Sequence, residues 1–371
     1  MSRFAPIASL TLAAFAAGCR KEPSEAASQV APAFAPRSDA ELSLLEPSGG
    51  QCVWKRVGLP SKATTEVARF PGSCVGARVA WSPDLSRAVV WFDPTFRSGT
   101  TYHGPDTPGS GHPEDPAVDG PVRLFQVDLA TGKVVVLPEP VVRGSLADLG
   151  FAATGVLAFS TEDLPDAKEG DAFDVGGETI TLPLIADGLP ALAHAVRLEG
   201  AAWTRVESKV TTTGWDYAAG AAALDSWNQL GPRTEVLSTF HSLGDAVEDE
   251  ATRALLAPWT PPPSADETDG WAVLRNPLGN LFGWQVSGEF AYTTGLLVFQ
   301  PQGKPPAPLP NLGFTRGDLL AIELRGPYLL VALTSVGTWP RVYDLREAKL
   351  AFASDTARAA VFWPKVKPAA K

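Results

Sequence analysis

The most constraining feature of the sequence is a series of short apolar runs, each ended by Gly, Pro, Asp or Asn, from about residue 75 onward. Runs of this length between turn residues are typical of β-strands, whereas helices need longer segments of period 3.6. The 34 Gly, 34 Pro and 11 Trp also favour turns and aromatic-rich strands. We therefore predict an all-β domain, with strands at 78–81, 87–92, 122–127, 133–137, 155–160, 179–182, 281–286, 296–300, 319–324, 328–333, 341–343 and 350–353.

One segment, residues 242–257, has the pattern of a helix. Ser242 and Asp245 can cap its start, and Pro258 ends it. The prolines that follow favour an extended chain. We predict that residues 231–270 form a partly helical, Pro-rich insertion, and we assign strands between about 185 and 280 by continuity alone.

Two pairs of segments repeat one another. Residues 125–134 align with 341–350, and each has a strand, Asp-Leu, a tight turn and a Lys that begins the next strand. Residues 77–83 align with 357–364 after one inserted residue. A repeated unit of strands and turns indicates a ring of similar sheets, in which only short edges stay unpaired.

Residues 81–87, W-S-P-D-L-S-R, resemble the W-S-P-D-G repeats of β-propellers, seen in WD-repeat-like proteins and in the propeller of the Tol periplasmic system, although Leu85 replaces the usual glycine. The D-L-A-T-G-K turn at 128–133 is similar to turns of propellers that bind pyrroloquinoline quinone. In those families a tryptophan follows the lysine, whereas Val134 stands here, and we predict no cofactor. The resemblance implies a propeller-like domain over residues 46–371.

The domain has room for roughly five to seven four-stranded blades, once the loop at 93–121 and the insertion are discounted. Such rings are often closed by a sheet that mixes both ends of the domain. The strand around 52–56 would then share a sheet with residues 358–363. A β-sandwich with a second small β domain is the alternative.

The N-terminal residues have the pattern of an export signal. Arg3 precedes an apolar run over 4–17 that is too short to span a bilayer. The run ends in A-A-G-C, which resembles the lipobox of bacterial lipoproteins. This resemblance implies a signal peptide at 1–18 and a lipid on Cys19. Cleavage by the ordinary signal peptidase remains an alternative, because Ala16 stands where leucine is commonest, and so does a buried apolar helix.

Residues 19–45 are rich in Ala, Ser, Pro and Glu, and we predict a disordered tether. With Cys19 carrying lipid, Cys52 and Cys74 form an even pair, which predicts a disulfide in an oxidising compartment, with two buried free thiols as the alternative. These features together predict a lipid-anchored protein of the bacterial cell envelope, in the outer membrane and facing the periplasm or the exterior.

Candidate sites of chemistry are few. The six possible metal ligands in the 93–121 loop have no spacing that aims them at one point, and a solvated loop is favoured. They are His103, Asp106, His112, Glu114, Asp115 and Asp119. The acidic stretch 162–171 lacks the ligand pattern of an EF-hand and is interpreted as a charged hairpin tip. His194 and His241 occur singly and are interpreted as structural. We predict no catalytic, cofactor-binding or metal-ligating residue, because the nucleophile, phosphate-loop and zinc motifs are missing from the sequence.

The chain carries 41 acidic and 31 basic residues and no dense Lys/Arg cluster, which excludes nucleic acid as a partner. We predict a lipid-anchored propeller that acts as a binding or scaffolding surface for a protein of the cell envelope, without catalysis. It resembles in plan the propeller lipoprotein of the outer-membrane barrel assembly machinery. The alternatives are an envelope enzyme, either a quinone-dependent dehydrogenase or a glycan-active lyase or hydrolase, and a lineage-specific surface protein.

Overall fold

The computed structural model describes residues 40–93, 121–140, 145–152, 155–164, 168, 170–175, 178–181, 191–211, 236–237, 245–262, 269–286, 292–310, 312, 320–333 and 338–364. Within these ranges the chain consists of antiparallel strands, one α-helix, α2 (Glu250–Leu256), and the 3-10 turn η1 (Ala257–Trp259). Neither helix is long and apolar enough to cross a membrane.

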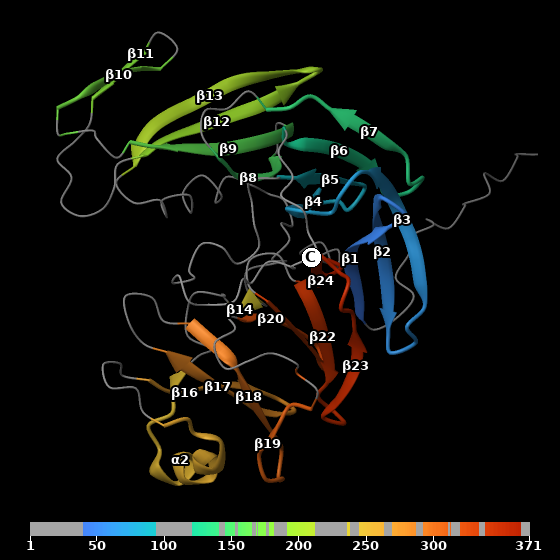
Figure 1. Ribbon diagram of the computed structural model, residues 1–371, viewed down its shortest axis with the longest axis vertical. Coiled ribbons are helices and arrows are strands. Elements are labelled where there is room, and N and C mark those ends of the chain that lie inside the picture. Colours follow the sequence, from blue (N-terminus) through green and yellow to red (C-terminus); the bar gives the residue numbers. More distant parts are fainter. Residues whose placement is uncertain are drawn as a thin grey trace, which may run out of the picture.

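Five antiparallel sheets of four or five strands follow one another around an arc (Figure 1). Strands that follow one another in the chain mostly lie next to each other in a sheet, as in the blades of a β-propeller. We number these sheets blades 1 to 5. The arrangement confirms the predicted all-β, propeller-like class over the sandwich alternative, and the five blades among the described residues lie at the lower end of the expected number.

The blades are built from the following strands. Blade 1 has the order β24 (Ala359–Phe362), β1 (Ala40–Ser48), β2 (Gln51–Leu59), β3 (Thr64–Pro71). Blade 2 has the order β4 (Ala77–Trp81), β5 (Arg87–Phe92), β6 (Arg123–Asp128), β7 (Val134–Leu137). Blade 3 has the order β8 (Ser145–Ala152), β9 (Gly155–Asp163), β12 (Ala191–Glu199), β13 (Ala202–Thr211). Blade 4 has the order β15 (Asp245–Ala246), β16 (Gly270–Asn276), β17 (Gly279–Val286), β18 (Tyr292–Pro301), β19 (Ala307–Pro308). Blade 5 has the order β14 (Val236–Leu237), β20 (Leu320–Arg325), β21 (Tyr328–Leu333), β22 (Thr338–Asp344), β23 (Lys349–Ala353). The strands β10 (Ala172–Val175) and β11 (Glu178–Thr181) form a separate hairpin.

All twelve predicted strands are present, as β4 to β7, β9, β11, β17, β18 and β20 to β23. The predicted closure is also confirmed, because β24 pairs with β1 and so lies in one sheet with β2. We call the β24–β1 pair the seam. Its register runs from Leu42 opposite Phe362 to Leu45 opposite Ala359. Residues 40–45 thus belong to β1 and are buried, so the predicted boundary between tether and domain at residue 46 is wrong.

The helix starts later than predicted. Asp245 and Ala246 form β15 and pair with β16, so the expected helical start is wrong. Asp249 caps α2 instead, since its carboxylate accepts a hydrogen bond of 2.7 Å from the Thr252 amide. Ser242 lies outside the described residues.

The helical part of the insertion covers one face of blade 4. Leu256 of α2 is fully buried against Trp271 and Trp284 of this blade. Trp271 also donates a hydrogen bond of 2.9 Å from Nε1 to the hydroxyl of Thr260. The insertion is therefore packed into the core of the domain and adds the edge strand β15 to blade 4.

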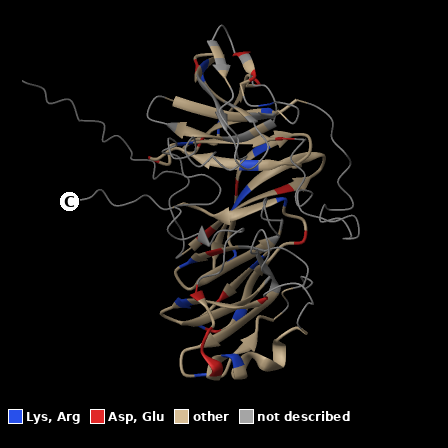
Figure 2. Ribbon diagram, turned by 90° about the vertical axis from the view of Figure 1, so that its left-hand side faces the viewer, with Lys and Arg blue, Asp and Glu red and all other residues tan. Residues whose placement is uncertain are grey.

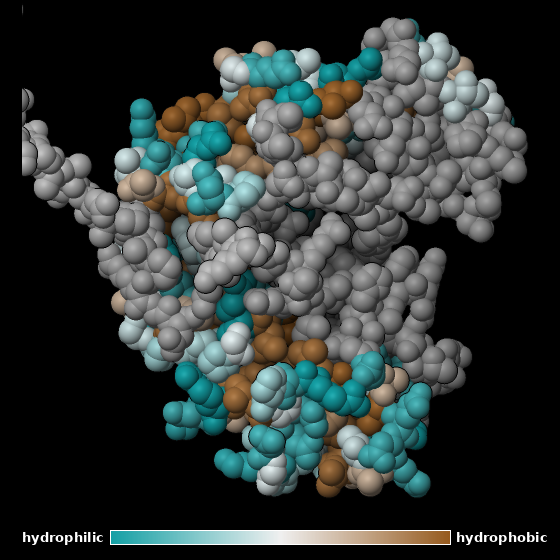
Figure 3. All heavy atoms as spheres, turned by 180° about the vertical axis from the view of Figure 1, so that it is seen from behind, coloured by the Kyte–Doolittle hydropathy of each residue, from teal (hydrophilic) through white to brown (hydrophobic). Residues whose placement is uncertain are grey.

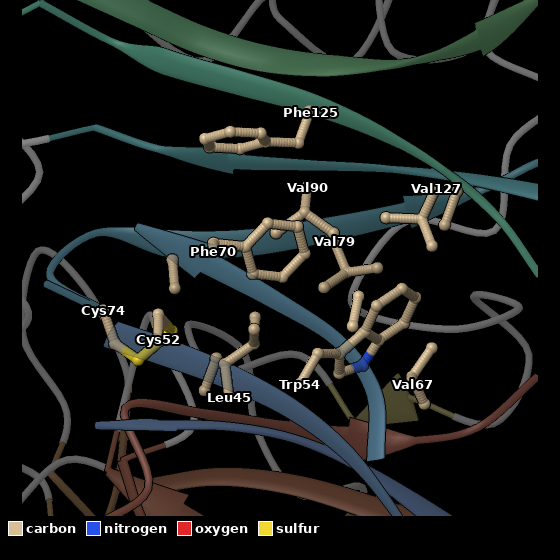
Figure 4. Packing of buried hydrophobic residues seen from close by; sticks show 14 of the residues in the cluster. Leu45, Cys52, Trp54, Val67, Phe70, Cys74, Val79, Val90, Phe125 and Val127 are labelled. Atoms are coloured by element: carbon tan, nitrogen blue, oxygen red, sulfur yellow. A yellow bond between two sulfur atoms is a disulfide. The ribbon is translucent and has the colours of Figure 1, made fainter. Parts of the chain in front are cut away.

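The cores lie between neighbouring blades, and the cluster between blades 1 and 2 is rich in aromatic residues (Figure 4). Phe70 of β3 packs against Phe92 and Phe125 of blade 2, with ring centroids 5.4 and 5.1 Å apart. Burying each such ring stabilises the fold by roughly 1.5–3 kcal/mol. Each blade is thus held by contacts with its neighbours as well as by its own hydrogen bonds.

The repeated segments 125–134 and 341–350 occupy equivalent places in their blades. Each joins the third full-length strand of a blade to the fourth, β6 to β7 in blade 2 and β22 to β23 in blade 5. Leu129 and Leu345 are both buried, and the amide of each donates a hydrogen bond of 2.9 Å to a preceding loop, at Ser86 and Pro327 respectively. The two turns therefore share one geometry.

The turn conformation explains one difference between these repeats. Gly132 has φ 71°, and Ala348 at the equivalent position has φ 51°. A residue with a Cβ is strained in this left-handed region, whereas glycine is not.

We predict that Ala348→Gly raises the free energy of unfolding by roughly 0.5–1 kcal/mol, because relief of this strain exceeds the added entropy of the unfolded chain. Denaturant unfolding measures the change. Ala351→Gly in β23 is the control and should lower stability, since this alanine lies within a strand. Destabilisation by both substitutions would contradict the interpretation.

The W-S-P-D-L-S segment forms the turn between β4 and β5. Leu85 has φ 54° at the position where related repeats have glycine. The hydroxyl of Ser82 donates to Asp84 Oδ1 over 2.6 Å, and the amide and hydroxyl of Ser86 donate to the same oxygen over 3.1 and 2.8 Å. The bond from Ser82, with those from Ser86, lowers the pKa of Asp84 to about 2.

Because the pKa of Asp84 is lowered by folding, the ionised carboxylate stabilises the turn above the unfolded-state pKa of about 4, and this contribution is lost as the pH falls to about 2. We expect wild type to be more stable than Asp84→Asn at pH 7 and to lose this advantage between pH 4 and 2. Melting temperatures of both proteins across that range measure it. A difference independent of pH would contradict the assignment.

Candidate functional site

The inner strand of blade 5, β20, contacts β24 of the seam. Figure 1 shows β24 and β20 near the middle of the arc. Glu323 of β20 connects them, since its Oε2 accepts a hydrogen bond of 2.9 Å from the Phe362 amide of β24. Its Oε1 lies 3.1 Å from Nη2 of Arg325. All of these groups are buried, so the carboxylate satisfies an inner-edge amide of β24 and its charge is balanced by the guanidinium.

A second buried ion pair lies on the other face of the seam. Arg56 of β2 donates to Glu41 of β1, and its guanidinium carbon lies 4.6 Å from the ring centroid of Trp363. The Trp363 ring packs against Trp54 and Trp81, with centroids 5.2 and 5.7 Å away. The amide of Trp363 also donates to the Glu41 carbonyl over 2.7 Å. These charged groups therefore hold the closing strand in place.

The inner edges of blades 4 and 5 carry short added strands. Val236 and Leu237 of β14 pair with Glu323 and Ile322 of β20, and β15 pairs with β16 in the same way. Both short strands come from the region predicted to be an insertion between strands. The chain itself thus covers part of the inner edge on this side of the arc.

The two cysteines predicted to pair do so: Cys52 of β2 and Cys74 before β4 form a disulfide with Cα atoms 4.9 Å apart. Both are almost fully buried in the core between blades 1 and 2. A disulfide closing a segment of this length stabilises a fold by roughly 3 kcal/mol in the chain-entropy model. The alternative of two free thiols is wrong.

Several predicted sites fall outside the described residues, namely Cys19, His241 and the six candidate ligands between His103 and Asp119. The acidic stretch 162–171 connects β9 of blade 3 to the separate hairpin of β10 and β11, so the predicted hairpin tip is wrong. His194 is buried in β12, between Ser160 and Ser208 of the adjacent strands. Across the described ranges, no group of three or more His, Cys, Asp or Glu gathers in a way that could hold a metal ion.

The outer strand of blade 2 has a different character from the inner strands. β7 lies at the edge of its sheet and at the periphery of the molecule (Figure 1), and Val135 and Val136 are 46% and 72% exposed. Hydrophobic residues reach the surface on this side of the molecule, at the upper left of Figure 3. Acidic and basic residues are interspersed over the strands in Figure 2. An open apolar strand edge is a site for pairing with another chain.

The sequence contains signals for these residues. The three consecutive valines of β7 indicate an apolar strand, but they do not indicate that the strand lies at the edge of its sheet. Glu323 and Arg325 are charges inside an apolar run, L-A-I-E-L-R, where buried pairing is needed for a charge to be tolerated. Which groups would satisfy them depended on the position of the neighbouring blade.

No protein-family model matches the chain, and no curated protein matches its sequence. Among solved structures the chain is similar to TolB from Acinetobacter baumannii, with 11% identity, a TM-score of 0.27 and coverage of 88% of this chain and 56% of TolB. It is also similar to the acylaminoacyl peptidase of Pyrococcus horikoshii and to dipeptidyl peptidase 4 of Porphyromonas gingivalis. Each of these two matches has 10% identity and a TM-score of 0.24 and covers 85% of this chain, with 46% of the first protein and 45% of the second covered. The chain thus spans about half the length of each of these proteins. The scores are low, and the propeller-like class rests on the strand pairing of this chain.

We predict that Glu323→Ala lowers the free energy of unfolding by about 3–5 kcal/mol, because it leaves the buried Arg325 charge and the Phe362 amide without the carboxylate. Glu323→Gln should cost less, since its amide oxygen can still accept from Phe362. Glu347→Ala is the matched control: its ion pair with Lys349 is exposed, so the loss should stay below about 1 kcal/mol. Denaturant unfolding measures both changes. Equal losses of unfolding free energy for Glu323→Ala and the control would refute the stabilising role of the hydrogen bond between the Phe362 amide and Glu323.

Proposed function

We propose that this chain is a lipid-anchored protein of the bacterial cell envelope whose propeller-like domain binds another protein and performs no catalysis. The observation that carries the binding role is the edge of β7, which pairs with no further strand among the described residues and has Val135 and Val136 exposed at the outer side of blade 2. Apolar strand edges of this kind receive an additional strand from a partner.

The buried charges agree with a binding role. Glu323, Glu41 and Arg56 are each engaged in a bond that connects strands at the seam. Glu323 joins blade 5 to blade 1, and the Glu41–Arg56 pair joins β1 to β2 within blade 1. The bonds of these groups leave them poorly placed to exchange protons with a substrate. The rigid arrangement of the blades presents the outer strands at fixed positions.

The location in the cell envelope is supported by two observations. The buried Cys52–Cys74 disulfide is typical of proteins that fold in an oxidising compartment. The lipobox-like sequence ending at Cys19 supports attachment through lipid, and several acyl chains on one cysteine hold a protein firmly to a membrane.

The anchor is tested with Cys19→Ser in the full chain, expressed in a bacterial host. We expect wild type to incorporate labelled palmitate and to sediment with membranes, and the variant to be unlabelled and released by osmotic shock with its disulfide intact. Ser24→Ala in the adjacent segment is the control and should behave as wild type. An unlabelled wild type in the soluble fraction would contradict the anchor.

The binding role is tested by crosslinking in intact membranes followed by affinity purification. We expect wild type to recover a specific protein, which includes a second copy of this chain, and Val136→Lys to lose it. Leu255→Lys is the matched control, because Leu255 is 52% exposed on α2, on blade 4. Equal recovery by all three forms, or recovery of no protein by wild type, would refute binding at β7.

A further inference from the structure

None of the four residues of β7 is charged or a proline. Natural edge strands are protected by charges, proline or a bulge. β7 has the sequence V-V-V-L, and its pairing with β6 is regular from Val127–Val134 to Leu124–Leu137. Pro138 limits the strand at its far end only, where its carbonyl accepts a hydrogen bond of 2.9 Å from Trp203 of blade 3.

The hydrogen-bond pattern shows which groups of β7 point outward. The Asp128 amide donates to the Lys133 carbonyl over 2.9 Å, so the carbonyl of Lys133 points toward β6. Residues that bond toward the neighbouring strand alternate along an antiparallel ladder, and Val135 and Leu137 therefore also bond toward β6. The amide and carbonyl groups of Val134 and Val136 point away from the sheet and are placed to pair with a further strand.

The charges at the two ends of this edge have opposite sign. Lys133 precedes β7 and Glu139 follows it, and both side chains are exposed. The residue midway between them is Val136, which is also the most exposed of the large apolar side chains described and carries outward-pointing backbone groups. A two-fold axis at Val136 would therefore place Lys133 of each copy opposite Glu139 of the other.

We propose that β7 pairs in an antiparallel manner with β7 of a second copy of this chain, with Val136 opposite Val136, and so joins blade 2 of both copies into one continuous sheet. This inference rests on the proposed function, because it names the partner that occupies the same edge. A self-complementary surface of this kind forms a closed two-fold dimer.

A second copy fits this edge better than an unrelated peptide, because the opposite end charges of Lys133 and Glu139 are symmetric about Val136. Val136 also has outward-pointing backbone groups, so the two copies of this residue can exchange a pair of hydrogen bonds. Val134 lies opposite Pro138 in this register, and Pro138 has no amide hydrogen to donate. The contact is short, so the dimer is weak in dilute solution. Attachment of both copies to one membrane raises their effective concentration and favours the pair.

The register is tested by cysteine crosslinking of the full, anchored chain in native membranes under mild oxidation. Residues directly opposite each other in such a pair have Cα atoms about 5.5 Å apart, within the range of a disulfide. Val136→Cys should therefore give a covalent dimer. Val135→Cys should crosslink at least about fivefold less, because its nearest copy lies diagonally at about 7–8 Å, and Leu255→Cys on α2 should give only the background of the chain without an added cysteine.

The charge arrangement is tested in the Val136→Cys background. Lys133→Glu alone and Glu139→Lys alone should each reduce the covalent dimer severalfold, because like charges then face each other. The double variant Lys133→Glu/Glu139→Lys should restore it. Folding of each variant is checked by its unfolding transition, since Glu139 also accepts a hydrogen bond of 3.3 Å from the Val122 amide.

Crosslinking at residue 136 with restoration in the double variant supports the proposal. Equal crosslinking at 136 and 255, or no crosslink at 136, overturns it. If crosslinking at 136 fails while wild type still recovers a different protein that Val136→Lys loses, the self-pairing is wrong and the binding role of β7 stands. If neither is observed, both proposals are wrong.

Discussion

The structure depends on the pairing of β24 with β1, which joins residues more than 300 positions apart into one blade. Two contacts hold this seam on its two faces. Glu323 satisfies the Phe362 amide from blade 5, and the Arg56–Glu41 pair with the stacked Trp363 holds the strand against blade 2. Without them the closing strand would leave buried polar groups unsatisfied, which costs more than the bonds themselves contribute.

The rest of the fold combines local hydrogen bonding with contacts between blades. Most strands pair with neighbours in the chain, which closes short loops at small entropic cost. The apolar residues then pack between sheets, and the Cys52–Cys74 disulfide joins β2 to the chain that enters blade 2. The same arrangement places the outer strands at the periphery, where β7 stays unpaired on one side among the described residues.

Much of the fold could be predicted because strands and turns are encoded locally. The apolar runs located twelve strands, and the repeat at 125–134 and 341–350 marked two equivalent turns. The structure adds that both turns have a left-handed residue at the same position, Gly132 and Ala348. The start of the helix was mispredicted, because the Asp249 cap and the pairing of β15 with blade 4 outweighed the local helical pattern. For the candidate site, the sequence located the β7 valines and the even cysteine pair but not the partners of Glu323.

The sequence by itself determined the all-β class, the repeated unit and the even cysteine pair, because each depends on local patterns or on residue types that can pair in few ways. Only the tertiary structure decided which buried charges meet at the seam, which face of blade 4 the insertion covers and that β7 forms an edge of its sheet among the described residues. These outcomes depend on contacts between blades distant in sequence, and no local pattern specifies which blade lies beside which.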